Sequence, residues 1–469
     1  MHPEGALDAG LLDRLEAFIR PVLLGLPKRA RRDLGQLYVA GLLGPGERKS
    51  VEPIVRRQQG GEALARERRM REMLADDDWN AQSLMVDGAE RLLRATDGWE
   101  AYTLDDTALL KRGWHSVGVG KQYAGCVGHV TNCQCLVTMG LASNAISTLI
   151  LTRLFLPQTW FGSKSAKRRE EARVPEAVVR RGYQTKHEIV LGLIEQLRLE
   201  GMPKLPFLCD SGYGGSTEFR QALSARDEEY VAGVTLDMSV WDAGVTFELP
   251  KRKPGPGRNP LRMVPVGAPK PKSVLSMAKG LPPAAWTEVT WREGSRGPQR
   301  SRFAAVRVRA ARGYDTTTGT VTEVHPEEWL LVHWPDGEPE PTKAWLSNLP
   351  KDTGLLRLVQ LARLRWRIER DHQEGKELLG LDHYEGRSWH GLHHHLALVL
   401  LAQQFLALER WTEQKKAQLA APPVEPAAPP PEAFPPSLAV ALVLRHRRAP
   451  AGAHRPVPVS VLPDVPAAH

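Results

Sequence analysis

The spacing of apolar residues changes along the chain and predicts helices in one part and strands in the next. From Leu11 to about Gly98, apolar residues recur at helical intervals, as in LLDRLEAFIRPVLLGL and AQSLMVDGAERLLR, with breaks at Pro21 and at a GPG turn. From Ala101 the pattern becomes short β-like runs separated by glycines and polar turns. We therefore expect an α-helical N-terminal domain over residues 1–98, followed by a sheet.

Strands and helices fill the next part of the chain, residues 99–236. The runs AYTLDDT, HSVGVGKQYAG and CQCLVTMGLA predict three successive strands, most economically a meander. A helix at 188–199, the apolar run LPFLCD, a helix at 216–225 and a strand at 230–236 follow. This order predicts an α/β domain with a mixed sheet flanked by helices.

The second half of the chain predicts an insertion, a return to the α/β domain, and a tail. Residues 237–349 contain many Gly and Pro residues, β-branched runs and six tryptophans, which predict a β-rich insertion. Helical patterning returns over 350–416, the second part of the α/β domain. The segment 417–469 is rich in proline and is expected to be disordered, because such a composition cannot build a packed core.

Composition narrows the class of protein. A chain of 469 residues with 42% hydrophobic and 25% charged residues suits a soluble protein of two or three domains. Four irregularly spaced cysteines exclude a disulfide framework and a four-cysteine zinc site, which favours a reducing cytoplasm. The N-terminus lacks the pattern of a signal peptide, and the apolar run Leu396–Leu408 is too short to span a bilayer. That run predicts a buried helix, and no membrane partner is expected.

Positive charge is concentrated in one internal segment. The chain carries a net charge of +9, but residues 251–312 hold fifteen Lys and Arg against two Glu. Residues 1–98 are balanced, with sixteen bases and sixteen acids. A concentrated basic segment favours contact with phosphate, with a solvated loop as the alternative.

The tract LARLRWRIERDHQEGKELLGL, residues 361–381, predicts a helix with charged residues on one face. Arg365, Glu369 and Lys376 lie four and seven residues apart, which places them on that face within about 16 Å of helix axis. Taken alone, the tract is typical of a solvated helix with ion pairs. His372 either shares the charged face or is a surface histidine.

Two further acidic motifs favour a metal site. In LDDT, Asp105 and Asp106 lie near the end of a predicted strand, and only one can face a shared site because alternate strand residues face opposite ways. In CDSGYG, Asp210 ends another apolar strand and is followed by a glycine turn. Together with Glu369, these acids indicate a carboxylate trio that binds Mg²⁺, a hard cation that prefers oxygen ligands.

The motifs LDDTALLKRG, SVGVGKQYAG, FLCDSGYG and RWRIERDHQEGKELLGL, in this order, resemble the DDE transposases of bacterial insertion sequences. The resemblance is closest to family seven-zero-one, a relative of family four, and spans roughly residues 34–408. It implies a ribonuclease-H-like fold, in which the first and fourth strands are neighbours. It also implies the catalytic acids Asp105, Asp210 and Glu369 and two Mg²⁺ ions, with Mn²⁺ as a substitute.

The same family carries a signature of Tyr, Arg, Glu and Lys on the catalytic helix. Arg365, Glu369 and Lys376 match it, whereas Ala362 stands at the tyrosine position. Arg365 and Lys376 are therefore expected to hold phosphate.

Relatives also line bound DNA with an insertion that precedes this helix. The basic segment lies in the corresponding part of this chain, where Arg307 and Arg309 are expected to contact DNA.

Other features have ordinary interpretations beside functional ones. The tryptophans of the insertion either pack in a core or stack on an extruded base. Cys133 and Cys135 suit alternating strand positions better than a metal site. The histidines in 390–395 lack a third type of metal ligand, and the basic run 28–32 is either a contact to DNA ends or a solvated helix face.

Together these features predict a transposase that binds terminal inverted repeats through its N-terminal domain. It would cleave DNA with Mg²⁺ and join the ends to double-stranded target DNA, as a homodimer associated with the cytoplasmic nucleoid. Two alternatives stay open: a catalytically inactive or repurposed transposase that acts as a DNA-binding repressor, and a ribonuclease-H-like nuclease without strand transfer.

Overall fold

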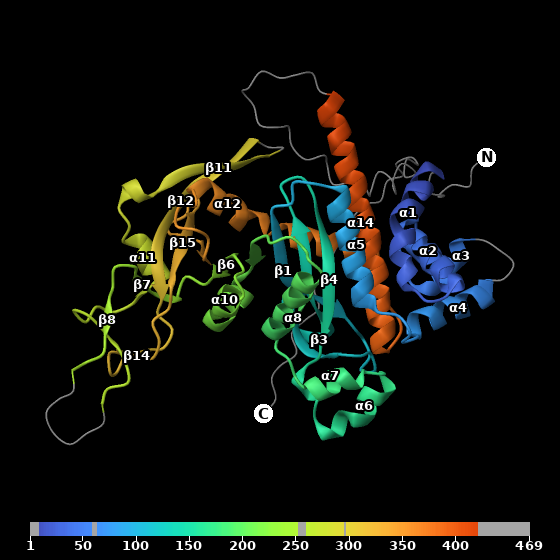
Figure 1. Ribbon diagram of the computed structural model, residues 1–469, viewed down its shortest axis with the longest axis horizontal. Helices are drawn as coiled ribbons and strands as arrows, with labels where there is room; N and C mark the ends of the chain where they lie inside the picture. Colours follow the sequence, from blue (N-terminus) through green and yellow to red (C-terminus); the bar gives the residue numbers. More distant parts are fainter. Residues whose placement is uncertain (1–8, 59–62, 252–258, 295–296, 421–469) are drawn as a thin grey trace, which may run out of the picture.

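The computed structural model describes residues 9–58, 63–251, 259–294 and 297–420 (Figure 1). Of the segment 417–469 that is expected to be disordered, residues 417–420 instead complete a helix, and residues 421–469 lie outside the described residues. Within the described part, helices and strands follow the predicted sequence of helical region, sheet, β-rich insertion and C-terminal helices.

Five helices form the N-terminal region. They are α1 (Ala9–Val22), α2 (Arg29–Leu43), α3 (Val51–Arg57), α4 (Ala63–Ala75) and α5 (Ala81–Ala95). Helices α2, α4 and α5 pack along α14 (Trp389–Ala420), as Figure 1 shows for the blue and orange-red helices. The apolar core of this region is therefore continuous with that of the sheet.

Six strands build the α/β region. They are β1 (Ala101–Leu110), β2 (Gly120–Ala124), β3 (His129–Ala142), β4 (Ser147–Phe155), β5 (Phe207–Cys209) and β6 (Tyr230–Val234). Strand β3 lies antiparallel between β1 and β4, whereas β5 is parallel to β1 and β6 is parallel to β5. The spatial order β4-β3-β1-β5-β6 confirms the ribonuclease-H-like mixed sheet, with β2 as an additional hairpin strand on β3.

Helices cover both faces of this sheet. Helix α8 (Lys186–Leu199) lies on one face, and α13 (Arg367–Glu377) lies with α14 on the other. The shorter helices are α6 (Ala166–Glu171), α7 (Glu176–Arg181), α9 (Ser211–Gly214) and α10 (Thr217–Ser224). A capping box between Thr185 and Glu188 begins α8.

The predicted β-rich insertion extends the same sheet. Its elements are β7 (Ser239–Asp242), β8 (Phe247–Glu248), β9 (Val264–Pro265), β10 (Lys272–Ser273), α11 (Val274–Lys279), β11 (Thr287–Gly294), β12 (Gly297–Ala310), β13 (Tyr314–Asp315), β14 (Thr320–Val321), β15 (Glu327–Trp334) and β16 (Lys343–Ser347). Strand β16 pairs antiparallel with β6, so that most strands of the insertion belong to one sheet of twelve strands, while β8–β9 and β13–β14 form two separate two-stranded sheets. The insertion is thus joined to the α/β sheet through backbone hydrogen bonds.

The prediction of one helix over 361–381 is wrong. Helix α12 (Leu355–Leu364) ends before α13 begins, and Arg365 lies in the break. The two helices are buried in different cores: Leu361 and Leu364 pack against the insertion, while Ile368 packs in the main core. The helix is interrupted because its two halves pack in different cores.

The run Leu396–Leu408 is confirmed as part of a buried helix. Helix α14 is long and apolar enough to cross a membrane by length and composition, but 94% of its most apolar window is buried inside the molecule. Its apolar surface is therefore already covered by the N-terminal helices and the sheet.

Candidate active site

The first two predicted acids come from neighbouring parallel strands. Strands β1 and β5 pair Thr103 with Leu208, and the same register two residues further sets Asp105 opposite Asp210. Neighbouring strands lie about 4.8 Å apart. Burial raises the pKa of Asp105 to about 7, and the charge of Asp210 contributes to this shift. The two carboxyl groups thus lie close enough to disfavour simultaneous ionisation without a cation.

Asp105 lies in the middle of β1 rather than near its end, because β1 continues to Leu110. Its backbone carbonyl accepts a hydrogen bond from the Thr138 hydroxyl, and the two residues are paired across β1 and β3. An acid at a central strand position is held by the sheet on both sides. Its location is therefore rigid.

A tight turn fixes Asp210 at the end of β5. Its side-chain Oδ1 accepts hydrogen bonds from the backbone of Gly212 at 3.0 Å and Tyr213 at 3.3 Å, which caps α9. A Cβ on Gly214 would overlap the carbonyl oxygen of Gly233 in β6. Glycine is therefore required where this turn packs against the neighbouring strand.

Arg365 joins the first acid to the third. Its Nη1 lies 3.2 Å from Asp105 Oδ2, and its other terminal nitrogen pairs with Glu369 Oε1. Burial lowers the pKa of Arg365, but these two carboxylates more than reverse that effect and raise it. The Glu369 side chain is 59% exposed, whereas that of Asp105 is 17% exposed. Arg365 thus serves as the counter-ion of the acidic centre.

The three acids have the donor chemistry for Mg²⁺, although they do not converge on one point in this conformation. Among the residues that the structure describes, no group of three His, Cys, Asp or Glu side chains is close enough to hold a metal ion. Asp105 and Asp210 are close enough to repel each other electrostatically, and exposed Glu369 is turned toward Arg365. Carboxylate oxygens suit Mg²⁺, and the repulsion between the two aspartates favours a cation there.

Asp106 lies on the opposite face of the sheet from Asp105. Its Oδ2 is 2.7 Å from Lys186 Nζ on α8 and accepts a hydrogen bond from the Cys135 thiol. This geometry favours Asp105 over Asp106 as the metal ligand. The pairing of Asp106 with Lys186 was not predicted; the only signal was the TKHEI motif at the start of α8.

His372 is neither on the charged face nor on the surface. It is buried on α13, and its Nε2 lies 2.7 Å from the Thr138 hydroxyl on β3. Burial lowers the pKa of His372 to about 3, so the ring is neutral. The hydrogen bond docks α13 on the strand that pairs with the Asp105 strand.

The remaining predicted phosphate contacts have internal partners in this conformation. Lys376 Nζ donates to the carbonyl of Ala108 on β1. Arg309 Nη2 lies 2.9 Å from Glu327 Oε1, and Arg307 donates to the Glu327 carbonyl. Strand β12, which carries both arginines, is five strand spacings from β1 in the sheet, or about 24 Å. The structure therefore does not bring these two arginines to the acidic centre.

Buried positions account for several of the other candidate features. Trp345 is buried, and Trp291 packs edge-on against Phe303 at 5.5 Å, as in an apolar core. Ala362, at the position where relatives carry tyrosine, is buried in the core shared with the insertion. Arg31 in the basic run pairs with acids of the loop after α4.

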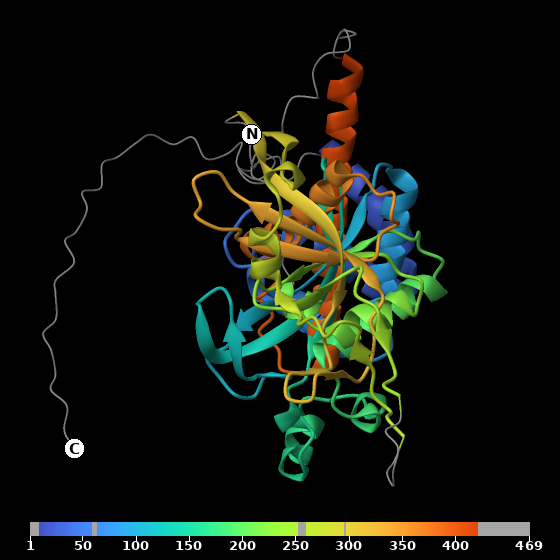
Figure 2. The same cartoon turned by 90° about the vertical axis from the view of Figure 1, so that its left-hand side faces the viewer.

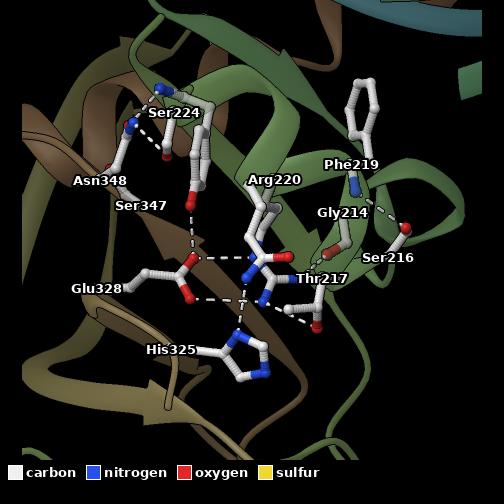
Figure 3. A network of polar contacts seen from close by, with 12 residues as sticks. Gly214, Ser216, Thr217, Phe219, Arg220, Ser224, His325, Glu328, Ser347 and Asn348 are labelled. Carbon is white, nitrogen blue, oxygen red and sulfur yellow. Dashed lines mark hydrogen bonds and ion pairs between the residues drawn. The ribbon is translucent and has the colours of Figure 1, made fainter. Parts of the chain in front are cut away.

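A buried network connects the Asp210 turn to the insertion (Figure 3). Arg220 on α10 donates through Nε to Glu328 Oε1 on β15 at 2.9 Å, and the Tyr230 hydroxyl donates to the same oxygen at 2.7 Å. Arg220 Nη1 also donates to the carbonyl of Gly214, four residues after Asp210. The ion pair of Arg220 and Glu328 is almost fully buried, with side chains 1% and 5% exposed.

Comparison with known proteins gives one family match. The family described as DDE superfamily endonuclease matches residues 21–298, a span that includes Asp105 and Asp210 and ends before Glu369. No curated protein matches the chain. Among solved structures, the chain is similar to a piggyBac transposase in a synaptic complex with hairpin DNA, with 9% identity and a TM-score of 0.38, over 88% of this chain and 74% of that one.

Proposed function

The chain belongs to the DDE superfamily of endonucleases, and we propose that it is a transposase that cuts DNA at the ends of its element and joins those ends to a target. The observation that carries this proposal is the pair of neighbouring carboxyl groups, Asp105 and Asp210, linked through Arg365 to Glu369. Asp105 with its raised pKa, the neighbouring Asp210 and an exposed third acid suit cation-assisted phosphodiester chemistry.

Each residue has a separate task in this proposal. Asp105 and Asp210 would hold Mg²⁺ from the rigid sheet, and Glu369 would complete the ligand set after its side chain leaves Arg365. Bound there, the metal would supply activation of the attacking oxygen and stabilisation of the leaving oxygen. Arg365, released from the acids, then contacts the phosphate, because a guanidinium binds phosphate and carboxylate with the same geometry.

The remaining features of the proposal concern partners. The N-terminal helices would bind terminal inverted repeats, and the basic insertion would contact the DNA backbone. Two ends must be held together for joining, which supports a homodimer on the DNA of the cytoplasmic nucleoid. Mn²⁺ would substitute for Mg²⁺, since both accept carboxylate oxygens.

A cleavage assay tests the proposal. The full chain is incubated with Mg²⁺ and a supercoiled plasmid that carries the gene with its native flanking DNA. We expect cuts and joined products with the wild type, and at least about a thousandfold loss for Asp105→Asn, since the metal ligands act as a unit. Asp106→Asn is the matched control on the opposite face, and we expect it to stay within a few-fold of wild type.

The outcomes separate the alternatives. No cleavage by the wild type, or equal cleavage by Asp105→Asn, would exclude the enzymatic proposal and leave a DNA-binding repressor if the flanking DNA is still bound. Cleavage without joined product would indicate a nuclease without strand transfer. The alternative of a catalytically inactive transposase is retained because Glu369 is paired with Arg365 in this conformation.

A further inference from the structure

The strand that carries Asp105 continues into a basic hairpin. Beyond Asp105, β1 runs to Leu110, and the chain then forms a loop over residues 111–119 and the hairpin of β2 and β3. Residues 110–133 contain three Lys and Arg and no Asp or Glu. In Figure 2 this blue-green hairpin projects away from the helices. A projecting hairpin that carries basic residues and no acidic ones suits an anionic partner.

Large apolar side chains are exposed on this hairpin. Trp114 is 52% exposed, Tyr123 is 64% exposed and Val130 is 59% exposed. Tyr123 and Val130 are cross-strand partners, and Lys121 lies two residues before Tyr123 on the same face. The Lys121 ammonium lies 5.7 Å from the centre of the Trp114 ring. We call these four residues the hairpin patch.

Neighbouring residues hold the loop of the hairpin patch in place. Arg168 Nη2 donates to the backbone carbonyls of Trp114 and Val119, at 2.8 and 2.9 Å. The Trp160 indole also donates to the Val119 carbonyl, and the Arg168 guanidinium lies 4.0 Å from the Trp160 ring centre. The exposed aromatic ring of Trp114 thus stands on an anchored backbone rather than on a freely moving loop.

The hairpin patch lies on the same face of the sheet as Asp105. Strand residues alternate between faces, so Val130 and Thr138 on β3 share one face, and Thr138 is paired with Asp105. Eight residues separate Val130 from Thr138, which is about 27 Å of strand. This length equals about 8 nucleotides of one DNA strand at 3.4 Å each.

We propose that the hairpin patch is a DNA-binding surface that holds a strand about 8 nucleotides from the phosphate at the acidic centre. Trp114 and Tyr123 stack on bases that are unpaired or unstacked, and Lys121 contacts the adjacent phosphates. This inference rests on the proposed function, because that function brings DNA to Asp105. It adds a contact that neither the insertion nor the N-terminal helices supply.

Charge favours DNA over a second copy of the chain as the occupant. In a symmetric dimer through this surface, the hairpin patch would meet itself, and Lys121 would face its own copy with no acid in the hairpin to neutralise it. A DNA strand instead supplies phosphates for the cation and bases for the exposed rings. The test includes self-association as an outcome.

The first measurement is binding by the full chain of a fluorescein-labelled 30-nucleotide single strand and a 30-base-pair duplex, followed by anisotropy. We expect Trp114→Ala/Tyr123→Ala to bind the single strand at least about tenfold more weakly than wild type, with a smaller loss on the duplex. Trp411→Ala is the matched control, since Lys415 lies 5.3 Å from that ring on α14. Single-strand binding by the double variant within twofold of wild type, or an equal loss in Trp411→Ala, would overturn the inference.

The second measurement locates the contact. A photo-crosslinking residue at the exposed position, Tyr123→p-benzoylphenylalanine, is irradiated with the plasmid DNA that the wild type cuts. We expect crosslinks about 8 nucleotides from the mapped cut. Crosslinks to a second protein chain, or a change of oligomeric state in the double variant without weaker DNA binding, would overturn the inference. Because the anisotropy measurement needs no cleavage, a failure of the proposed catalysis is distinguishable from a failure of the hairpin patch.

Discussion

At the scale of single residues, Arg365 holds the acidic centre together in the conformation described. A guanidinium between Asp105 and Glu369 neutralises charge that would otherwise accumulate beside Asp210. The acids can therefore fold close to one another without metal. In the proposed function, metal binding would then exchange one cation for another rather than build the site.

This exchange predicts how stability responds to chelation. We expect EDTA to leave the free energy of unfolding of the wild type unchanged, because Arg365 already supplies the counter-charge. We expect Arg365→Met to lose about 1–3 kcal/mol of unfolding free energy in EDTA and to recover part of it with Mg²⁺, since one partner of a partly buried ion pair is removed. Urea unfolding in EDTA and in roughly 5–10 mM Mg²⁺ measures both effects.

Arg370→Met is the control for the Arg365 variant. Arg370 is exposed on α13, 5.6 Å from the Trp366 ring, and makes no ion pair with the predicted acids that the structure describes. Equal destabilisation of the two variants in EDTA, or no recovery of Arg365→Met with Mg²⁺, would show that Arg365 is not the counter-ion of the centre.

At the scale of secondary-structure elements, α14 depends on neutral histidines. His395 is fully buried, accepts a hydrogen bond from the Tyr38 hydroxyl at Nδ1, and donates from Nε2 to the carbonyl of Gly380. These partners suit the neutral ring with its proton on Nε2. Burial lowers the pKa of His395 to about 4, whereas an unfolded histidine titrates near about 6.5.

The sign of this shift predicts acid sensitivity. Because the folded pKa is the lower one, the unfolded chain binds a proton first as pH falls. The contribution of His395 to stability is therefore complete above about pH 6.5 and is lost as pH falls toward 4. We expect His395→Gln to remove up to about 1.4 kcal/mol per pH unit from the slope of unfolding free energy in that window.

Urea unfolding between pH 4.5 and 7.5, roughly the window given by the two pKa values, measures the slope. Exposed His115 is the control, and His115→Gln should keep the wild-type slope. A slope for His395→Gln that equals that of wild type would contradict a neutral buried ring.

Sequence patterns predicted the local elements well and failed where tertiary packing decides, and the role of the three acids stays a prediction. The apolar run before Asp210 and the glycines after it specify a strand and a turn on their own. The break at Arg365 could not be predicted, because Leu361 and Ile368 share a helical stripe yet are buried in different cores. The pairing of Asp106 with Lys186, 80 residues apart, likewise depends on how α8 docks on the sheet.

At the scale of the whole molecule, the insertion and the catalytic sheet share one set of strands and one buried ion pair. Strand β16 continues the sheet from β6, and Arg220 binds Glu328 across the junction while also holding the Gly214 carbonyl. The insertion is therefore connected to the Asp210 turn through the backbone and through this ion pair.

A double-mutant cycle tests this connection. We expect Arg220→Met to cost about 3–5 kcal/mol because it leaves Glu328 buried without its partner, and Arg220→Met/Glu328→Met to cost less than the two single changes summed. The control pair Arg300 and Glu288 is exposed, at 60% and 51%, and should couple by less than about 1 kcal/mol. Urea unfolding of the variants gives the coupling. Additive effects for Arg220 and Glu328 would mean that the pair does not join the two parts.

The packing of α14 also determines when the apolar core of the protein can form during synthesis. The N-terminal helices and β4 bury apolar residues against α14, which is synthesised last among the described elements. At 5–20 residues per second, roughly 20–80 s pass between the appearance of α1 and that of α14 on the ribosome. During that time the growing chain contains Asp105 and Asp210, the two aspartates proposed as metal ligands, but it lacks both Glu369 and α14. If the proposed function holds, nuclease activity therefore becomes available only when synthesis has passed α14, the last of the described elements.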